Sequence, residues 1–373
     1  MNKKMIRDKK LEKILPHTLV LLLAGCIMLT LMSCQNEVTD DKPVRVILDT
    51  DFAPDVDDAV ALAQLHGLAG LGECEIIATI HTASCEYSAG VMSAFNDWHG
   101  HKVPVGAIQR DGLPERDTPC NIWLGDYATP LYYEFSDLRY EGLRNDVTSS
   151  TTLYRQLLSD AGENKVTIVT IGFLNGIKQL LKSDGDHLDD RNGVELVKEQ
   201  VDKIVIMGGS TKDGHRSWNF HGSNTDDVID AAAYVFENWP DEDVPMHFVA
   251  AEGENHNWGS SQWERDPEAD DIRTAYSAPE QDPDHILYRA LEEFGGVHNG
   301  SGIHLADPAT VLYVVRPERF VIRTGTQIWA GDGRTYWMDD EEGLHTVIDG
   351  YVGTGTELMN ELEVLTWTPR QNN

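Results

Sequence analysis

The chain has 373 residues, which suits one large α/β domain or two modest ones, and we expect one. Its hydrophobic content of 41% is enough for a sizeable core. The 62 acidic residues outnumber the 30 basic ones and give a formal net charge of −32. A phosphate backbone would repel most of such a protein, so we expect no nucleic-acid partner.

Residues 1–33 differ in composition from the rest. Several Lys and Arg residues precede an apolar run over residues 19–32, and Ser33 and Cys34 follow it. This order is typical of an export signal. The apolar run has about 14 residues, whereas a membrane-spanning helix needs about 20. Residues 31–34 resemble a bacterial lipobox, in which the cysteine is lipidated and becomes the new N-terminus.

Residues 23–26 match the lipobox letters as well, but cleavage before Cys26 would leave an apolar stretch on the processed chain. We therefore expect residues 1–33 to be a lipoprotein signal peptide. The chain would then be exported and anchored to a bacterial membrane only through the lipid on Cys34, on the periplasmic or cell-surface side. Losing residues 1–33 removes six basic and two acidic residues, which leaves a net charge of −36.

Residues 34–43 are interpreted as a polar tether, and residues 44–373 as a single domain. Cys74, Cys85 and Cys120 lie in this domain. An oxidising compartment permits one disulfide among these three cysteines and leaves one thiol unpaired, with the pairing open.

Short apolar, β-branched runs alternate with Ala- and Leu-rich segments from residue 44 onward. The predicted strands are 44–48, 75–82, 165–171, 203–207 and 244–250, and the predicted helices are 59–68, 88–98, 174–182 and 226–237. This alternation predicts an α/β fold with a mainly parallel central sheet and helices on both faces, in the Rossmann-like manner. Residues 185–193 and 252–284 are interpreted as surface insertions, and residues from 320 onward as hairpins and a C-terminal cap.

Five carboxylates lie within ten residues after the first predicted strand: Asp49, Asp51, Asp55, Asp57 and Asp58. Such sheets bind ligands at the carboxyl ends of their strands. Mutual repulsion would be costly there without a compensating charge. An oxygen-only ligand set suits Ca²⁺ or Mg²⁺ and argues against zinc, and the tolerance of Ca²⁺ for irregular geometry favours Ca²⁺. The alternative is a solvated, acid-rich turn that caps a helix, but the buried strand directly before the cluster favours the metal.

Residues 46–59 read Val-Ile-Leu-Asp-Thr-Asp-Phe-Ala-Pro-Asp-Val-Asp-Asp-Ala. This segment resembles the N-terminal signature of the inosine-uridine-preferring nucleoside hydrolase family, with a loop two residues longer than in its best-known members. Further blocks follow in the family's order at residues 166–175, 206–209, 217–220 and 307–309. The resemblance covers residues 44–320 and implies a nucleoside hydrolase-like fold. It also implies hydrolysis of the N-glycosidic bond of a ribonucleoside or related ribofuranoside to free base and ribose.

The resemblance implies roles for individual residues. Ca²⁺ would be held by the side chains of Asp51, Asp58 and Asp307 and by the backbone carbonyl of Ile171, and Asp51 would also be the general base that activates the attacking water. The implied substrate-binding residues are Asp57, Asn219, Ser84 and Trp218. The first two would hydrogen-bond ribose hydroxyls, whereas Trp218 would either stack on the base or pack in the core.

The sequence departs from the family pattern around the substrate. Ala53 replaces a common Gly, Ser84 an Asn, Ser217 a Glu, and Ala306 a His that can protonate the leaving base. Other candidates for that acid are His81, His221 and His304, each with a structural or surface role as the alternative.

These departures motivate an alternative function, a non-catalytic lipoprotein that binds a nucleoside or sugar. A second alternative is a phosphohydrolase of the haloacid dehalogenase type, with Asp49 as nucleophile, Asp51 as acid and base, and Mg²⁺ as metal. The Lys motif and later acidic pair of that class are missing in the expected order. A second copy of the chain is a further candidate partner.

Overall fold

The computed structural model describes residues 42–53, 55–109, 126–211, 214–222, 226–250, 282–295 and 304–371. The chain divides into two units, Met1–Lys42 and Pro43–Asn373, and the description below concerns the second. The predicted signal peptide, residues 34–41 of the tether and most of the insertion at 252–284 lie outside the described residues. Within the described ranges, no helix combines the length and the apolar character needed to cross a bilayer.

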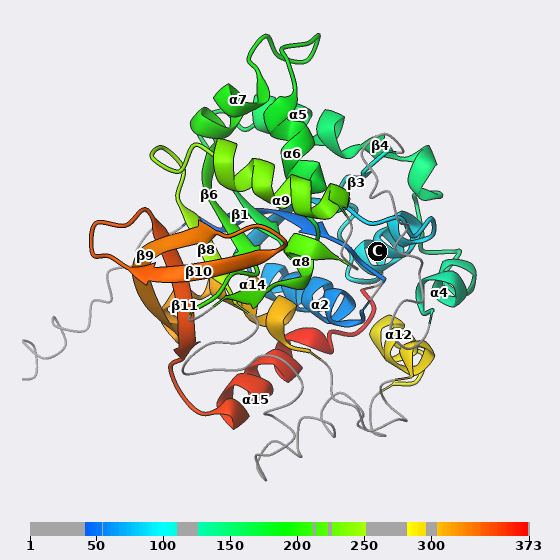
Figure 1. Cartoon of the computed structure of the whole chain (residues 1–373). Helices are drawn as coiled ribbons and strands as arrows, with labels where there is room; N and C mark the ends of the chain where they lie inside the picture. The colour runs from blue at the N-terminus through cyan, green and yellow to red at the C-terminus, as the bar shows by residue number, and fades with distance from the viewer. Residues whose placement is uncertain are drawn as a thin grey trace, which may run out of the picture. The chain divides into compact units, whose positions relative to one another are not determined.

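One sheet of eleven strands organises the second unit (Figure 1), in the order β4-β3-β2-β1-β5-β6-β8-β11-β9-β10-β7. The strands are β1 Val44–Thr50, β2 Cys74–His81, β3 Val105–Ala107, β4 Thr148–Ser149, β5 Val166–Thr170, β6 Val201–Met207, β7 His215–Arg216, β8 Met246–Val249, β9 Phe320–Trp329, β10 Arg334–Asp339 and β11 His345–Tyr351. In this sheet order, every neighbouring pair from β4 to β11 is parallel. The last three pairs, β11–β9, β9–β10 and β10–β7, are antiparallel.

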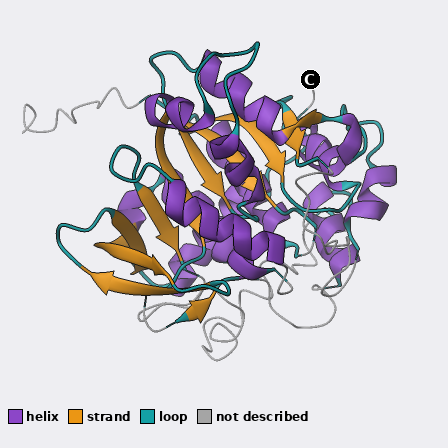
Figure 2. Cartoon of the chain, turned by 45° about the horizontal axis from the view of Figure 1, so that its top comes forward, coloured by secondary structure: helices purple, strands orange, loops and turns teal. Residues whose placement is uncertain are grey.

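Helices cover both faces of this sheet (Figure 2). The α-helices are α2 Asp57–Gly70, α3 Ser88–Trp98, α4 Ala128–Glu134, α5 Ser150–Asp160, α6 Asn175–Lys182, α7 Gly193–Gln200, α8 Trp218–His221, α9 Asp226–Asn238, α12 Ile286–Phe294, α14 Ala306–Val315 and α15 Gly355–Thr366, and the 3-10 helices are η2 Arg144–Asp146 and η3 Pro317–Arg319. Helices α5, α6, α7 and α9 form one layer, and α2, α14 and α15 lie in the other (Figure 1). The predicted mainly parallel α/β fold is therefore confirmed.

The strand sequences explain the two helical layers. Successive side chains of a strand point to opposite faces of the sheet. On β1, Val46 and Leu48 enter the hydrophobic cluster under α2 and α14, whereas Ile47 enters the cluster under α5 and α6. All three side chains are fully buried, which explains the uninterrupted apolar run over residues 46–48.

Several elements were not anticipated from the sequence. Strands β3, β4 and β7 have two or three residues and carry no usable periodicity. Helix α14 is buried at nine of its ten positions, so it lacks the polar face by which a surface helix is recognised. The hairpins expected after residue 320 are present as β9, β10 and β11, followed by α15.

The cysteines of the described ranges differ in state. Cys85 is disulfide-bonded, and its partner lies outside the described residues. Cys74 is a buried free thiol whose sulfur donates to the carbonyl of Leu65. One bridge and one unpaired thiol agree with the expectation from the sequence.

Helix α15 packs directly on α2 at Gly67. A Cβ added at Gly67 would collide with the backbone carbonyl of Leu365 on α15. Gly70, the last residue of the same helix, has open space around its missing Cβ. The close helix contact therefore depends on a glycine at one position of α2 and not at the other.

We expect Gly67→Ala to lower the free energy of unfolding by about 1–3 kcal/mol, because the extra methyl overpacks a backbone contact that cannot yield. Gly70→Ala is the matched control and should leave stability unchanged or raise it slightly, since Ala favours a helix over Gly. Chemical denaturation of both variants measures the difference. Equal losses in the two variants would contradict the packing argument.

Candidate active site

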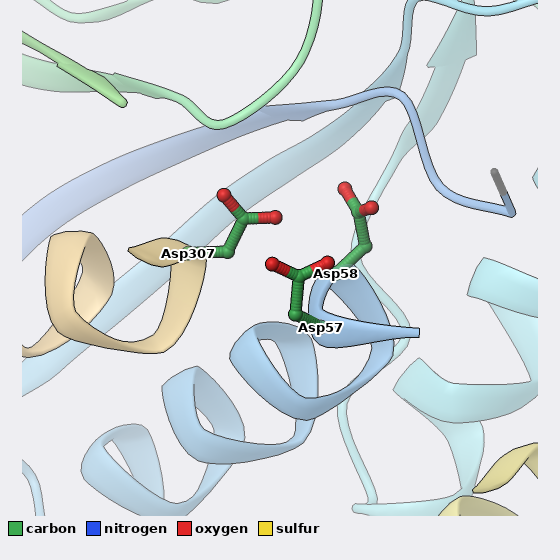
Figure 3. Close-up of side chains that lie close together, drawn as sticks. All are labelled: Asp57, Asp58 and Asp307. Atoms are coloured by element: carbon green, nitrogen blue, oxygen red, sulfur yellow. The ribbon is translucent and has the colours of Figure 1, made fainter. Parts of the chain in front are cut away.

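Three carboxylates converge at the carboxyl edge of the sheet (Figure 3). Asp57 and Asp58 are the first two residues of α2, and Asp307 lies in the first turn of α14. One oxygen of each carboxylate lies within 4.8 Å of the others, and all three side chains are buried. Figure 3 shows the carboxylates of the two neighbouring helices turned toward one another.

The electrostatics of this triad, Asp57, Asp58 and Asp307, are unfavourable without a cation. Helix N-termini favour acidic groups, but only by fractions of a kcal/mol each, ~0.3–1 kcal/mol. Burial raises the pKa of all three carboxyls well above the ordinary value, and repulsion from neighbouring aspartates raises it further. Protons and a metal ion would therefore compete for the same oxygens.

The triad fits a hard divalent cation. The Oδ1 atom of Asp307 is buried and has no hydrogen-bond partner among the described residues. A buried charged oxygen without a donor is costly, and a cation would satisfy it. The donor set contains only oxygen, as Ca²⁺ and Mg²⁺ prefer. No other group of three or more His, Cys, Asp or Glu in the described ranges has this geometry.

Thr50 orients one member of the triad. Its hydroxyl donates to Oδ1 of Asp58 and accepts from the backbone N–H of Phe52 at 3.1 Å. Its carbonyl accepts from the N–H of Thr82 at 2.8 Å, which fixes the end of β1 beside β2. Thr50 stands between two aspartates of the motif, and nothing in its own sequence context marked it as a functional residue.

Asp51 lies outside the triad. Its Oδ2 accepts a hydrogen bond from the indole Nε1 of Trp218 at 3.1 Å. Burial raises the pKa of Asp51 to about 7; the Trp218 bond opposes this effect, and repulsion from Asp55 adds to it. The charge of Asp51 in turn raises the pKa of Asp57 and Asp58, so Asp51 lies close to the triad.

The structure thus gathers Asp57 with Asp58 and Asp307, and the assignments of Asp57 to the sugar and of Asp51 to the metal stay predictions. Ile171 follows β5, and its N–H donates to the carbonyl of Asp49 at 2.8 Å, which sets this turn against the end of β1. A Cβ at the next residue, Gly172, would collide with the backbone N of Asp51. The Ile171–Gly172 turn therefore needs its glycine to approach the site.

The remaining predicted residues lie on α8 and after β2. Asn219 is fully buried, and its Nδ2 donates to the carbonyl of Met207 at 3.1 Å. Its Oδ1 has no hydrogen-bond partner among the described residues. The ring of Trp218 packs on Phe173, with centroids 5.9 Å apart. Ser84 is half-buried in the loop after β2.

Asp49 is separated from the other aspartates by its partners. It accepts from the hydroxyl of Tyr154 at 2.7 Å and from that of Thr82 at 3.2 Å. Burial raises the pKa of Asp49 to about 8, although both hydrogen bonds act to lower it. Tyr154 belongs to α5, and no sequence pattern connected it with the motif. The five aspartates are therefore not one ligand set.

A family model for the inosine-uridine preferring nucleoside hydrolases matches residues 46–360. The chain belongs to the inosine-uridine preferring nucleoside hydrolase family. No curated protein matches the chain. Family membership makes this protein an enzyme of the N-ribosyl hydrolase class, and it decides against the phosphohydrolase alternative.

Solved structures share the fold of this nucleoside hydrolase. The inosine-uridine preferring nucleoside hydrolase of Bacillus anthracis is 17% identical with a TM-score of 0.59, and covers 87% of this chain and 100% of its own. A plant nucleoside hydrolase is 20% identical with a TM-score of 0.59, and covers 88% of this chain and 100% of its own. The type III effector XopQ, complexed with adenosine diphosphate ribose, is 13% identical with a TM-score of 0.58, and covers 92% and 98%.

The histidines near the site of this nucleoside hydrolase differ in environment. His81 is fully buried with Nε2 at 3.2 Å from the carbonyl of Phe52, and burial together with the charge of Arg144 lowers its pKa to about 3. It is therefore neutral at neutral pH and has no extra proton to donate. The ring of His221 packs against that of Trp218 in a T-shaped, edge-to-face arrangement. His304 is exposed, and its charge opposes the effect of burial on the pKa of Asp55.

We expect Thr50→Val to weaken Ca²⁺ binding about 10-fold, the lower end of the usual loss when a ligand's hydrogen-bond partner is removed. Valine keeps the shape of threonine but cannot donate to Asp58. Thr50→Ser keeps the hydroxyl and should bind Ca²⁺ nearly as the wild type does. Calorimetric titration of the metal-free proteins gives the affinities. Unchanged affinity in Thr50→Val would remove Thr50 from the site.

Proposed function

We propose that this nucleoside hydrolase depends on Ca²⁺ and hydrolyses the N-glycosidic bond of a ribonucleoside or a related ribofuranoside. The observation that carries the proposal is the buried oxygen-only triad beside Asp51, with Oδ1 of Asp307 lacking a partner among the described residues. Neither feature suits a turn that only caps a helix. Both suit a resident hard cation next to a general base.

The cation would be held by the side chains of Asp51, Asp58 and Asp307 and by the carbonyl of Ile171, with Asp57 of the triad left to contact the sugar. Bound Ca²⁺ supplies positive charge that stabilises developing hydroxide and holds the sugar diol in place. Thr50 keeps the Asp58 carboxylate directed into the triad. All three triad side chains are buried, so the surrounding packing limits their movement.

Asp51 is the proposed general base. The oxygen of the attacking water bonds to the anomeric carbon, and one water proton passes to the Asp51 carboxylate. The carbon–nitrogen bond breaks, and its electron pair leaves on the nucleobase. The departing nucleobase must in turn take up a proton. Burial raises the pKa of Asp51 to about 7 in the absence of a cation, and a bound Ca²⁺ would oppose this rise and keep the carboxylate ionised, as a general base requires. The indole of Trp218 holds Oδ2 and thereby orients the carboxylate.

Asn219 and Asp57 are proposed to bind the ribose hydroxyls. The buried amide oxygen of Asn219 lacks a partner in the described part of the chain, and a sugar hydroxyl would donate to it. The substrate screen should include nucleosides with bases of several sizes and larger ribosides, because the structure of XopQ, which has the same fold, is a complex with adenosine diphosphate ribose. Ser84 and Trp218 would contact the substrate beyond the diol.

A screen of residues 36–373 against nucleosides and other furanosides with Ca²⁺, reading released reducing sugar, tests this proposal. Bound-metal analysis of the same preparation should give about one Ca²⁺ per chain. Zinc or no metal in that analysis would end the calcium assignment. Tight nucleoside binding without hydrolysis in single-turnover assays would support the non-catalytic alternative instead.

We expect Asp51→Asn to lower turnover by at least about 10²-fold, the usual loss for removing acid–base catalysis. Folding should survive, because the amide keeps an oxygen and the shape of the side chain. Asp307→Ala should instead weaken Ca²⁺ binding first and lose the stabilisation that the bound ion gives to the fold. Steady-state kinetics and thermal denaturation over a Ca²⁺ series separate the two defects.

In saturating Ca²⁺, Asp307→Ala should recover part of its activity, because extra metal refills a weakened site. Asp51→Asn should not recover, because metal cannot replace a missing base. Near wild-type turnover in Asp51→Asn at any Ca²⁺ concentration would show that Asp51 is not the base.

We propose in addition that the enzyme is exported and carries a lipid on Cys34. The apolar run before Cys34 supports this proposal, as does the disulfide at Cys85, because disulfides persist in oxidising compartments. Removal of the signal peptide should be sensitive to globomycin. Both this processing and acyl labelling should depend on Cys34 and not on Cys26. Labelling that survives Cys34→Ala and disappears in Cys26→Ala would move the lipid to Cys26.

A further inference from the structure

A second charged cluster lies at the opposite ends of the two helices that carry the triad. Arg316 caps the C-terminus of α14. Its guanidinium makes a bidentate pair with Glu73, from Nε to Oε2 and from Nη2 to Oε1, each at 2.7 Å. Its Nη1 donates to Oε1 of Glu361 on α15, also at 2.7 Å. Glu73 lies in the turn between α2 and β2, so one side chain joins three elements.

The geometry relates this cluster to the triad. Helix α14 carries Asp307 in its first turn and ends at Arg316, and α2 begins with Asp57 and ends at Gly70, just before Glu73. The two helices pack against each other, as their neighbouring ribbons in Figure 3 also show. At 1.5 Å per residue, α2 and α14 are about 21 and 15 Å long. Each is short enough to move as a rigid rod.

The cluster is suited to fixing a position. The side chains of Arg316 and Glu361 are 22% and 12% exposed, so the surrounding packing limits their movement. A planar guanidinium that makes a two-point contact defines an orientation as well as a distance. Burial acts to raise the pKa of Glu361, but hydrogen bonds from Tyr351, Arg316 and Arg319 outweigh it, so Glu361 is held ionised.

We propose that Arg316 is a positioning residue for the cation site, because it locks the far ends of α14 and α2 together and so fixes Asp307 relative to Asp57 and Asp58. The inference rests on the proposed cation function. A slide of α14 along α2 would be transmitted directly to the separation of the carboxylates. Ca²⁺ binds its oxygen ligands at distances of about 2.3–2.6 Å, so a shift of one carboxylate by ~1 Å would weaken the site.

Arg319 provides a matched control from the same cluster. Its Nη2 donates to Oε2 of Glu361 at 2.6 Å, and it also bonds the hydroxyl of Tyr351. These contacts join η3 to α15 and β11, and neither involves α2. Removing the Arg319 charge therefore disturbs the same carboxylate and the same surface without releasing α14 from α2.

The test compares Arg316→Gln, Arg316→Lys, Arg319→Gln and the wild type, each as residues 36–373, the part of the chain that follows the proposed lipidation site. Ca²⁺ affinity is measured by calorimetry, and stability by thermal denaturation with chelator. Arg316→Gln should bind Ca²⁺ about 10-fold more weakly, as expected when support around a metal ligand is lost. Arg316→Lys should recover part of this loss, because it restores one contact. Arg319→Gln should lower stability in chelator with Ca²⁺ affinity unchanged.

Wild-type Ca²⁺ affinity in Arg316→Gln would overturn the inference, and so would an equal loss of affinity in Arg319→Gln. If Arg316→Gln does not fold, Glu73→Gln replaces it, since this change removes the α2 side of the bridge and leaves Arg316 paired with Glu361. Its expected result is the same weakened binding, and wild-type affinity would again overturn the inference. A wild-type chain that binds no Ca²⁺ would instead refute the proposed function, which is a distinguishable result.

Discussion

Repulsion between buried carboxylates is the constraint on which the architecture around the site depends. Asp57, Asp58 and Asp307 are brought within 4.8 Å of one another and are removed from water. Two helix N-termini reduce the cost only in part, since each contributes a small, local effect. The packing of α2 against α14 must therefore hold the groups together against this repulsion. The apolar contacts of these helices with the sheet and with α15 provide that force.

The same constraint separates the aspartates by function. Asp49 is stabilised by two hydroxyl donors, and Asp58 accepts from Thr50 inside the triad. Asp51 accepts from the indole of Trp218, and burial places its pKa near 7. The three carboxylates thus have different hydrogen-bond donors, and a donor that bonds the ionised form favours that form. Neighbouring residues of one motif thus acquire different chemistry from their partners.

Local features of the site could be predicted from the sequence, because the strand, the turn and the helix start are consecutive. The parallel sheet followed from the alternation of apolar strands and helices. The partners that divide the aspartates could not be predicted, because they come from distant positions. Tyr154 and Asp49 are 105 residues apart, and Trp218 and Asp51 are 167 apart. Asp307 was connected to the cluster only through the family resemblance, since α14 has no amphipathic pattern.

None of the departures from the family pattern, at Ala53, Ser84, Ser217 and Ala306, falls on the triad. Ser217 stands where many members carry Glu, and its hydroxyl is engaged with the backbone of Gly209, accepting from N at 2.8 Å and donating to O at 3.1 Å. It therefore braces the turn after β6 in this chain. Ala306 cannot transfer a proton, and it is buried beside Asp307 at the start of α14. Ser217 and Ala306 therefore place no ionisable side chain next to the triad, and in the proposed reaction the leaving nucleobase must take its proton from another residue or from water.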